Sequence, residues 1–172
     1  MKARDGFVVL GGAGTIGRIV VRDLFDSNPR NRILIADFNE PAAHELAKSF
    51  RSPRLAASFA DASRPELLAR LMRGHAVVVN CTQHDFNLQV MAAALAAGVH
   101  YLDLGGLFHW TRRQLKLDQK FKQAGLTAVL GMGCAPGITN IMGHWAADRL
   151  ERVHSMKIRV AGADILIGPQ DR

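Results

Sequence analysis

Short apolar runs alternate with helical stretches along most of the chain. Strands are predicted at residues 7–10, 33–36, 55–59, 77–79, 100–102 and 126–130. Helices are predicted between them at residues 16–25, 41–50, 64–72, 87–97 and 111–123. This repeated order of strand, helix and strand indicates a parallel sheet whose crossover helices cover its two faces. It is typical of a doubly wound α/β fold.

The first predicted strand leads directly into a glycine-rich turn, which reads Gly12-Ala13-Gly14-Thr15-Ile16-Gly17. In a G-x-G-x-x-G turn between a strand and a helix, the first glycine permits the tight bend. The second lets a pyrophosphate approach the backbone, and the third lets the helix pack closely on the strand. The start of the helix offers free N–H groups to the phosphates. We therefore expect a Rossmann dinucleotide-binding domain in which all six residues of the turn contact the cofactor.

The second predicted strand is followed by Asp37, which stands 20 residues after Gly17. A carboxylate at this place accepts hydrogen bonds from the adenosine ribose hydroxyls and repels a 2′-phosphate. No arginine follows it, because the next residues are Phe38, Asn39 and Glu40. The sequence therefore predicts NAD as the cofactor, with NADP less favoured. The alternative is that Asp37 only caps the turn after the strand.

The carboxyl ends of the other parallel strands are expected to line the same crevice. The predicted cofactor contacts there, with Phe38 beside Asp37, are Asp61 and Ala62 after the third strand and Asn80, Cys81, Thr82 and Phe86 after the fourth. The first pair would lie near the adenine and the second group near the nicotinamide ribose and ring. A turn-forming role is the alternative for each of them.

The composition excludes several classes of protein. Of the 172 residues, 48% are hydrophobic and 22% are charged, which is close to the average for globular proteins and argues against disorder. The longest nearly apolar stretch, residues 90–99, is about half as long as a bilayer span. The first residues lack the apolar core of a signal peptide, so we expect a cytoplasmic protein with no membrane partner.

The net charge of +7 is compatible with nucleic acid binding, but the distribution of the charge is not. The basic residues are dispersed, and their one cluster, at residues 112–122, has the spacing of a solvated helix face. We therefore expect no nucleic acid partner. The histidines, Cys81 and Cys134 lack the spacing of metal ligands, so no metal site is expected. The two cysteines are interpreted as buried structural thiols.

Three further segments set this chain apart from Rossmann proteins in general. They are residues 77–81 (VVVNC), 98–106 (GVHYLDLGG) and 133–140 (GCAPGITN). Together with the glycine-rich turn, these segments resemble the saccharopine dehydrogenase family, and within it most closely the lysine 6-dehydrogenase-like members. The resemblance covers essentially the whole chain.

The resemblance implies an NAD(P)-dependent oxidoreductase that acts on the C–N bond of an amine or amino acid, such as lysine or saccharopine. Hydride would pass between the substrate carbon and nicotinamide. Since an amine must lose its proton before it releases hydride, a base is expected nearby, and Asp103 after the fifth strand is the catalytic candidate. A buried aspartate that bonds the turn after it is the alternative. Pro136, Gly137 and Asn140 are expected to form the roof of the site and to start the next helix.

The pattern of strands and helices changes near residue 130. Residues 1–132 are expected to form the Rossmann domain, and residues 133–172 the start of a truncated second domain. The second part would contain a connecting helix at 138–150 and a first strand at 155–160, and an apolar pattern continues at 163–167. Members of the resembled family are much longer, and their second domain binds substrate and mediates dimerisation. We therefore expect a homodimer for the full-length protein, and cofactor binding without turnover for this chain.

Two other classes of protein share the glycine-rich turn. A dinucleotide-sensing regulatory module, such as those of potassium transport systems, also carries the turn and the acid after the second strand, but it does not explain residues 103–106 and 134–137. A nucleoside-diphosphate-sugar epimerase or reductase needs a Tyr-x-x-x-Lys pair for proton transfer. The only tyrosine is Tyr101, and the residue four positions later is Gly105, which argues against that class.

Overall fold

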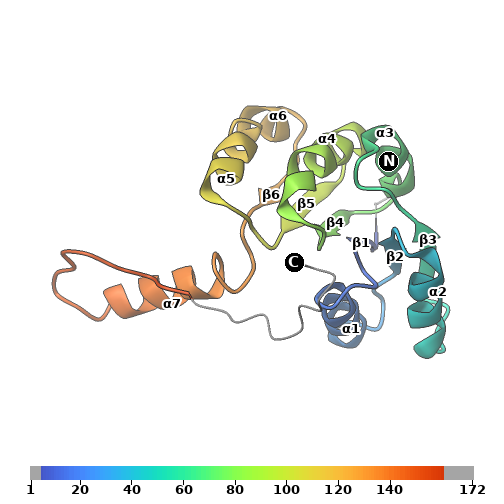
Figure 1. Cartoon of the computed structure of the whole chain (residues 1–172), viewed down its shortest axis with the longest axis horizontal. Helices are drawn as coiled ribbons and strands as arrows, with labels where there is room; N and C mark the ends of the chain where they lie inside the picture. Colours follow the sequence, from blue (N-terminus) through green and yellow to red (C-terminus); the bar gives the residue numbers. More distant parts are fainter. Residues whose placement is uncertain (1–4, 161–172) are drawn as a thin grey trace, which may run out of the picture.

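The computed structural model describes residues 5–160, and in these residues it forms a parallel sheet in the order β3-β2-β1-β4-β5-β6 (Figure 1). The strands are β1 (Phe7–Leu10), β2 (Ile33–Asp37), β3 (Leu55–Phe59), β4 (Val77–Asn80), β5 (His100–Asp103) and β6 (Ala128–Val129). The direction of winding reverses between β1 and β4, so a crevice is expected at their carboxyl ends. The predicted doubly wound α/β fold is confirmed.

Helices cover both faces of this sheet. They are α1 (Gly17–Ser27), α2 (Glu40–Ser49), α3 (Pro65–Met72), α4 (Asn87–Ala97), α5 (Phe108–Leu115) and α6 (Asp118–Gln123). A short 3₁₀ turn, η1 (His84–Phe86), precedes α4, and a further helix, α7 (Ile138–Ala147), lies beyond the sheet. Figure 1 shows α1 and α2 on one face and α3 to α6 on the other. Because α1 and α2 cover one face and α3 to α6 cover the other, both sides of the central strands are buried.

The core consists of two apolar layers, one on each side of β1. Val8 and Leu10 point into the layer formed with α3 and α4, where Leu68 packs. Val9 points into the layer formed with α1 and α2, where Val21 packs. The alternation along β1 is the period of two expected for a strand. All five side chains are at most 1% exposed, so β1 is buried on both faces.

The predicted helix 111–123 is two helices, α5 and α6. The backbone amides of Lys116 and Leu117 bond to carbonyls three residues earlier, Arg113 and Gln114, and this tightening bends the chain at that point. Leu117 packs on the core beside α4 and fixes the bend. The predicted strand 126–130 shortens to β6, because only its middle pairs with β5 at the edge of the sheet.

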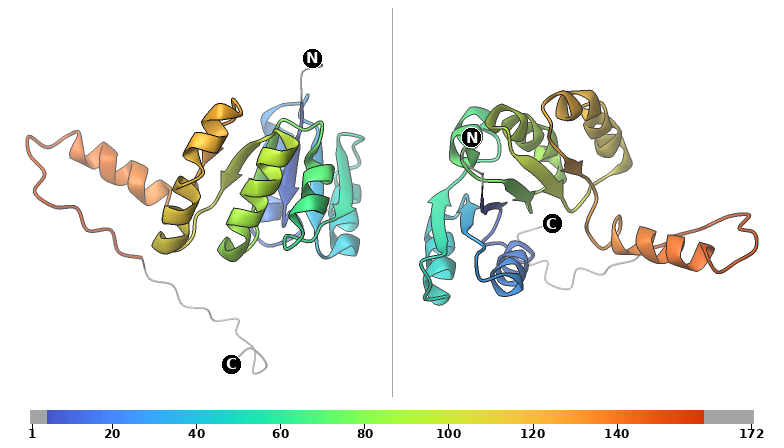
Figure 2. Two further views of the ribbon diagram at one scale, coloured as in Figure 1. Left: turned by 90° about the horizontal axis from the view of Figure 1, so that it is seen from above. Right: turned by 180° about the vertical axis from the view of Figure 1, so that it is seen from behind.

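Beyond the sheet the chain forms an arm that projects from the domain (Figure 2). Its helix α7 matches the start of the predicted helix 138–150 and ends three residues earlier. The predicted strand 155–160 is wrong: no strand forms there, and the segment returns along α7, where Met156 and Ile158 lie beside Gly143. A strand needs a neighbouring backbone to bond with, and this segment meets a helix. The predicted apolar stretch 163–167 lies outside the described residues.

The first testable prediction concerns the contact between α1 and β1. A Cβ on Gly17 would overlap the carbonyl oxygen of Gly11 and stand 2.7 Å from the Cα of Gly12. We expect Gly17→Ala to lower the free energy of unfolding by about 1–3 kcal/mol, the usual cost of overpacking, in urea denaturation. Gly14→Ala is the control, because a Cβ there meets only the Gly11 carbonyl oxygen, at 3.3 Å. Equal losses in the two variants would contradict this account.

Candidate functional site

A cleft of about 520 Å³ opens at the carboxyl ends of the central strands, where the winding reverses. It brings together most of the residues predicted from the sequence, namely Gly14, Asp37, Phe38, Asp61, Ala62, Cys81, Thr82 and Phe86. It is also lined by Leu10, Gly11, Ala60, Ser63 and Gln83, which the sequence analysis missed. Each lies within two positions of a predicted residue, so their position at the strand ends was a usable signal. The predicted residues that do not line the cleft are Gly12, Ala13, Thr15, Ile16, Gly17, Asn80 and Asp103.

The glycine-rich turn is held in place by backbone contacts. The amide of Gly11 donates to the carbonyl of Ala36 at 2.8 Å, and the amide of Gly14 donates to the carbonyl of Gly11 at 3.2 Å. A Cβ on Gly12 would stand 2.8 Å from the carbonyl oxygen of Val9, so that position requires glycine. No side chain caps the start of α1. The partial positive charge of that helix end is therefore free to attract an anion.

Asp37 links the end of β2 to this turn. Its Oδ2 accepts from the backbone amide of Ala13 at 2.9 Å, and its Oδ1 accepts from the amide of Asn39 at 2.9 Å. The second bond is the turn-forming alternative, although the residue that caps α2 is Asn39. A carboxylate has about four acceptor sites, so two remain for a ligand hydroxyl. The structure thus allows both the turn role and the binding role of Asp37.

On the β3 side, Asp61 is held in a local turn. Its Oδ1 accepts from the hydroxyl of Ser63 at 2.6 Å and from the amide of Ser63 at 2.9 Å. These two bonds, with a smaller contribution from the charge of Arg64, lower the pKa of Asp61 against the opposing effect of desolvation. At the rim, Phe38 is 71% exposed and its ring centroid lies 5.5 Å from that of Phe59. The aromatic faces suit a flat ring such as adenine.

On the β4 side, Asn80 lies beneath the cleft and is 1% exposed. Its Oδ1 accepts from the hydroxyl of Thr82 at 2.7 Å and from the amide of Thr82 at 3.2 Å. Asn80 therefore acts on the cleft through Thr82. Burial raises the pKa of the Cys81 thiol to about 12, so this lining residue presents a neutral S–H at physiological pH.

Asp103 is buried, with 1% of its surface exposed. Its Oδ1 accepts from the amides of Gly105 and Gly131, each at 2.8 Å, and its Oδ2 accepts from the Tyr101 hydroxyl at 2.9 Å and from Nε2 of Gln114 at 2.6 Å. The bond to Gly105 is the turn-holding alternative to a catalytic role. Four donors fill the acceptor sites of the carboxylate, so the arrangement suits a structural carboxylate better than a base open to substrate.

The loop after β6 leads into α7 at the predicted position, but Pro136, Gly137 and Asn140 do not line the cleft. Gly137 precedes the helix, and its amide donates to Oδ1 of Asn140 at 3.0 Å. Pro136 packs against the loop after β5, because a Cβ on Gly105 would stand 2.7 Å from its Cγ. Cys134 on this loop is exposed, so its interpretation as a buried thiol is wrong, whereas Cys81 is partly buried. Among residues 5–160, no three potential metal-ligating side chains gather at one place.

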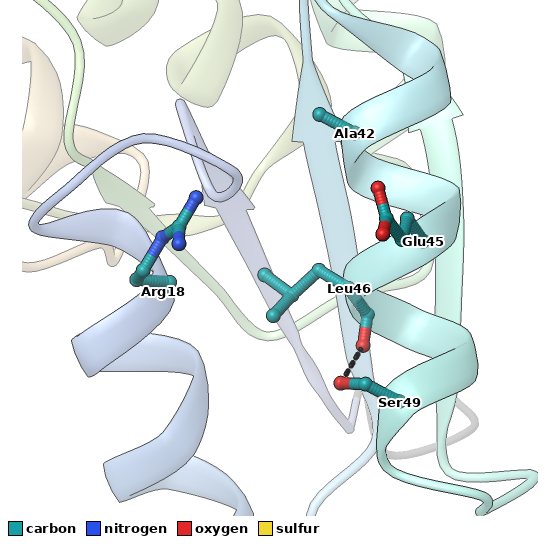
Figure 3. Close-up of a pocket in the computed structure, with 5 residues that line it drawn as sticks. All are labelled: Arg18, Ala42, Glu45, Leu46 and Ser49. Atoms are coloured by element: carbon teal, nitrogen blue, oxygen red, sulfur yellow. Dashed lines mark hydrogen bonds between the residues drawn. The ribbon is translucent and has the colours of Figure 1, made fainter.

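A second groove, of about 260 Å³, separates α1 from α2 below the glycine-rich turn (Figure 3). Arg18 on α1 faces Glu45 and Leu46 on α2 across it. The guanidinium of Arg18 reaches up to the turn and donates to the carbonyl of Ala13 at 2.9 Å. Ala13 is therefore fixed at both polar atoms, its carbonyl by Arg18 and its amide by Asp37.

The strand order, the glycine-rich turn and the acid after β2 define a dinucleotide-binding domain. Comparison with known families identifies the kind of dinucleotide-binding domain. The saccharopine dehydrogenase NADP binding domain matches residues 7–129, which is most of the chain. The protein belongs to this family, and a pyridine nucleotide is the cofactor class that the family implies. Neither the regulatory-module alternative nor the epimerase alternative is the family that matches. Tyr101, the tyrosine that an epimerase would need, is 1% exposed.

Individual relatives agree with this family. Carboxyaminopropylagmatine dehydrogenase from Synechocystis is 28% identical over 163 aligned residues, which cover 88% of this chain and 40% of the relative. The solved saccharopine dehydrogenase (L-Glu forming) from Saccharomyces cerevisiae matches with a TM-score of 0.73 at 21% identity, over 84% of this chain and 31% of that one. Triphenylmethane reductase from Citrobacter, solved with NADP(H), matches with a TM-score of 0.55 at 20% identity, over 72% and 48% of the two chains. At these identities the two solved structures show the shared fold alone.

This chain thus spans 40% of the length of the curated relative. Within residues 5–160, none of the helices is both long enough and apolar enough to cross a bilayer.

The cysteines give a prediction that depends on pH. Alkylation requires the thiolate, and burial raises the pKa of Cys81 to about 12, whereas Cys134 is exposed. At pH 8 we expect iodoacetamide to modify Cys134 while Cys81 stays unmodified, as followed by peptide mass spectrometry. Modification of Cys81 should increase as the pH rises toward that pKa. In urea both cysteines should react at similar rates, and similar rates in the folded protein would contradict the assigned burial.

Proposed function

We propose that this chain is the NAD-binding domain of an oxidoreductase that transfers hydride between nicotinamide and the carbon of a C–N bond in an amine or amino acid. One observation carries the proposal: the carboxylate of Asp37 and the glycine-rich turn meet at the Ala13 amide, 2.9 Å from Oδ2, at the edge of the cleft. This contact sets a ribose-binding acid directly beside a phosphate-binding turn. The boundary of the domain is proposed at residue 132, with residues 133–172 belonging to the following unit.

The residues of the cleft fit such a cofactor in two halves. The unfilled acceptor sites of Asp37 would bind the adenosine ribose, and the start of α1 would bind the diphosphate. Thr82, Cys81 and Phe86 line the other half, where the nicotinamide would lie. When bound, the nicotinamide supplies the hydride acceptor or donor, and the protein orients it and excludes water.

The preference for NAD rests on the charge of Asp37. A 2′-phosphate would lie next to this carboxylate, and two like charges at hydrogen-bond distance repel each other. Asn39 and Glu40, which follow, offer no cation to offset that repulsion. The name of the matching family refers to NADP, so this preference is a property proposed for this chain.

The substrate class is supported by the names of the relatives. One is a dehydrogenase named for an agmatine that carries a carboxyaminopropyl group, and the other is a saccharopine dehydrogenase that forms L-Glu. Both names point to amines of the amino-acid type. Because the four bonds of Asp103 leave it no free acceptor site, we propose that the base which takes the amine proton lies elsewhere in the full-length protein.

Three wider properties are also proposed. A cytoplasmic location is proposed for this dehydrogenase. The exposed apolar side chains of α7, including Ile141 and Trp145, are compatible with a second domain and a homodimer in the full-length protein. The dispersed basic residues support the absence of a nucleic acid partner.

Cofactor preference is tested by Asp37→Ser. Removing hydrogen bonds to a charged group costs about 1.5–3 kcal/mol, so the Kd for NADH should rise about tenfold or more. The Kd for NADPH should fall or stay unchanged, because the repulsion is removed. Asp26→Ser, an exposed aspartate on α1, is the matched control and should change neither value. Isothermal titration gives both constants, and unchanged NADH binding in Asp37→Ser would refute the assignment.

Catalysis by this chain alone gives a second test. If the substrate-binding residues lie outside these 172 residues, the chain binds NADH but forms none from NAD when lysine, saccharopine or related amines are added. Absorbance at 340 nm follows NADH formation, and fluorescence of bound NADH shows that the domain is folded and competent. Amine-dependent formation of NADH by this chain would show that the substrate site is already complete.

A further inference from the structure

A closed ring of five polar side chains lies beneath the nicotinamide half of the cleft. The ring is contributed by β4, β5, α4 and α5, and its members are Asn80, Asn87, Tyr101, Asp103 and Gln114. Each is 1% exposed. Burying this many polar groups is costly unless all of them are hydrogen-bonded, so the ring stands only if its donors and acceptors match.

The bonds around the ring can be followed from one side chain to the next. The hydroxyl of Tyr101 donates to Asp103 at 2.9 Å and accepts from Nδ2 of Asn80 at 3.4 Å. Nδ2 of Asn80 also donates to Oδ1 of Asn87 at 2.9 Å, and Nδ2 of Asn87 donates to Oε1 of Gln114 at 3.4 Å. Nε2 of Gln114 closes the ring on Asp103 at 2.6 Å.

Asp103 sets the direction of every bond in this ring. The carboxyl oxygens of Asp103 accept at all four sites, so the single proton of Tyr101 and one proton of Gln114 both point to it. Because the Tyr101 hydroxyl donates its proton to Asp103, it can only accept from Asn80. The amide nitrogen of Asn80, and not its oxygen, therefore points toward Tyr101. The amide oxygen of Asn80 must then face the opposite way, toward Thr82.

Thr82, which lines the cleft, extends the fixed direction of these hydrogen bonds to the ligand-binding surface. The Thr82 hydroxyl donates to Oδ1 of Asn80 at 2.7 Å, and its other acceptor, the carbonyl of Gln83, is farther away at 3.5 Å. With its proton held by Asn80, the hydroxyl offers only its lone pairs to a ligand. A ribose hydroxyl or a carboxamide N–H can donate to it, whereas an acceptor group cannot be bound there.

We propose that Asp103 and Tyr101 are positioning residues, which act through Asn80 to fix Thr82 as a hydrogen-bond acceptor for the nicotinamide half of the cofactor. This inference rests on the proposed function and assigns to Asp103 a role other than proton acceptor. The same carboxylate holds the amides of Gly105 and Gly131, so it also fixes the loops after β5 and β6.

The test uses Tyr101→Phe, which keeps the ring of the side chain and removes one link. Asp103 retains three of its bonds and Asn80 retains its bond to Asn87, so the variant should fold. Nδ2 of Asn80 then has Asn87 as its one remaining partner in the ring, so the amide is held less firmly and the Thr82 proton is freer to turn. Loss of up to one net hydrogen bond between Thr82 and the cofactor predicts a rise of up to about fivefold in the Kd for NADH. The Kd for ADP, which has no nicotinamide half, should change by less than about twofold, because ADP contacts the turn and Asp37, which lie outside the ring.

Thr82 supplies the decisive comparison. Thr82→Val should weaken NADH binding as much as Tyr101→Phe, and Thr82→Ser, which keeps the hydroxyl, should retain it. The double variant Tyr101→Phe with Thr82→Val should bind NADH no more weakly than Thr82→Val alone, because both changes remove the same contact.

The outcomes separate the two proposals. Additive losses in the double variant, or equal losses for NADH and ADP, would overturn the positioning role while leaving the cofactor site intact. Unchanged NADH binding in Tyr101→Phe would also overturn it. If the unmodified chain binds neither NADH nor ADP, the proposed function itself fails.

Discussion

The structure depends on the close contact between α1 and the end of β1. A side chain at Gly17 would overlap the carbonyl oxygen of Gly11, so only glycine lets the helix start directly beside the strand. This contact sets the uncapped end of α1 at the point where the winding of the sheet reverses. Ala13, in the turn between β1 and α1, is then held by Arg18 at its carbonyl and by Asp37 at its amide. The glycine-rich turn and the acid for which phosphate and ribose binding are proposed therefore share one base, and the rest of the cleft is arranged around it.

Most of the fold could be predicted from the sequence because local and tertiary requirements agree. The strands at 7–10 and 55–59 and the helix at 87–97 are found with the bounds predicted from apolar runs and a terminal glycine. Gly98 adopts φ +67°, the left-handed conformation that ends a helix. The gathering of Asp61, Cys81 and Thr82 at one cleft also follows from topology, because the carboxyl ends of parallel strands share an edge of the sheet.

The remaining features could not be predicted because they depend on partners distant in the sequence. The segment 155–160 has the alternation of a strand, but it lies against α7, where no backbone groups are free to pair with it. Gln114 stands among basic residues on a stretch that the sequence assigns to a solvated face. It is nevertheless buried, because its amide donates to Asp103 and accepts from Asn87. The ring under the cleft joins residues up to 34 positions apart, from Asn80 to Gln114, and no spacing in the sequence marks it.

The strand ends also show that turn formation and ligand binding are not exclusive. After β2, β3, β4 and β5, an Asp or Asn side chain accepts from the amide two residues later: Asp37 from Asn39, Asp61 from Ser63, Asn80 from Thr82 and Asp103 from Gly105. This shared turn leaves the other polar atom of each side chain to define its role. For Asp37 that atom meets the glycine-rich turn at the cleft, whereas for Asn80 and Asp103 it enters the buried ring. The same local turn therefore occurs at an acid that lines the open cleft and at two side chains of the buried ring, and the burial of the second polar atom separates the two cases.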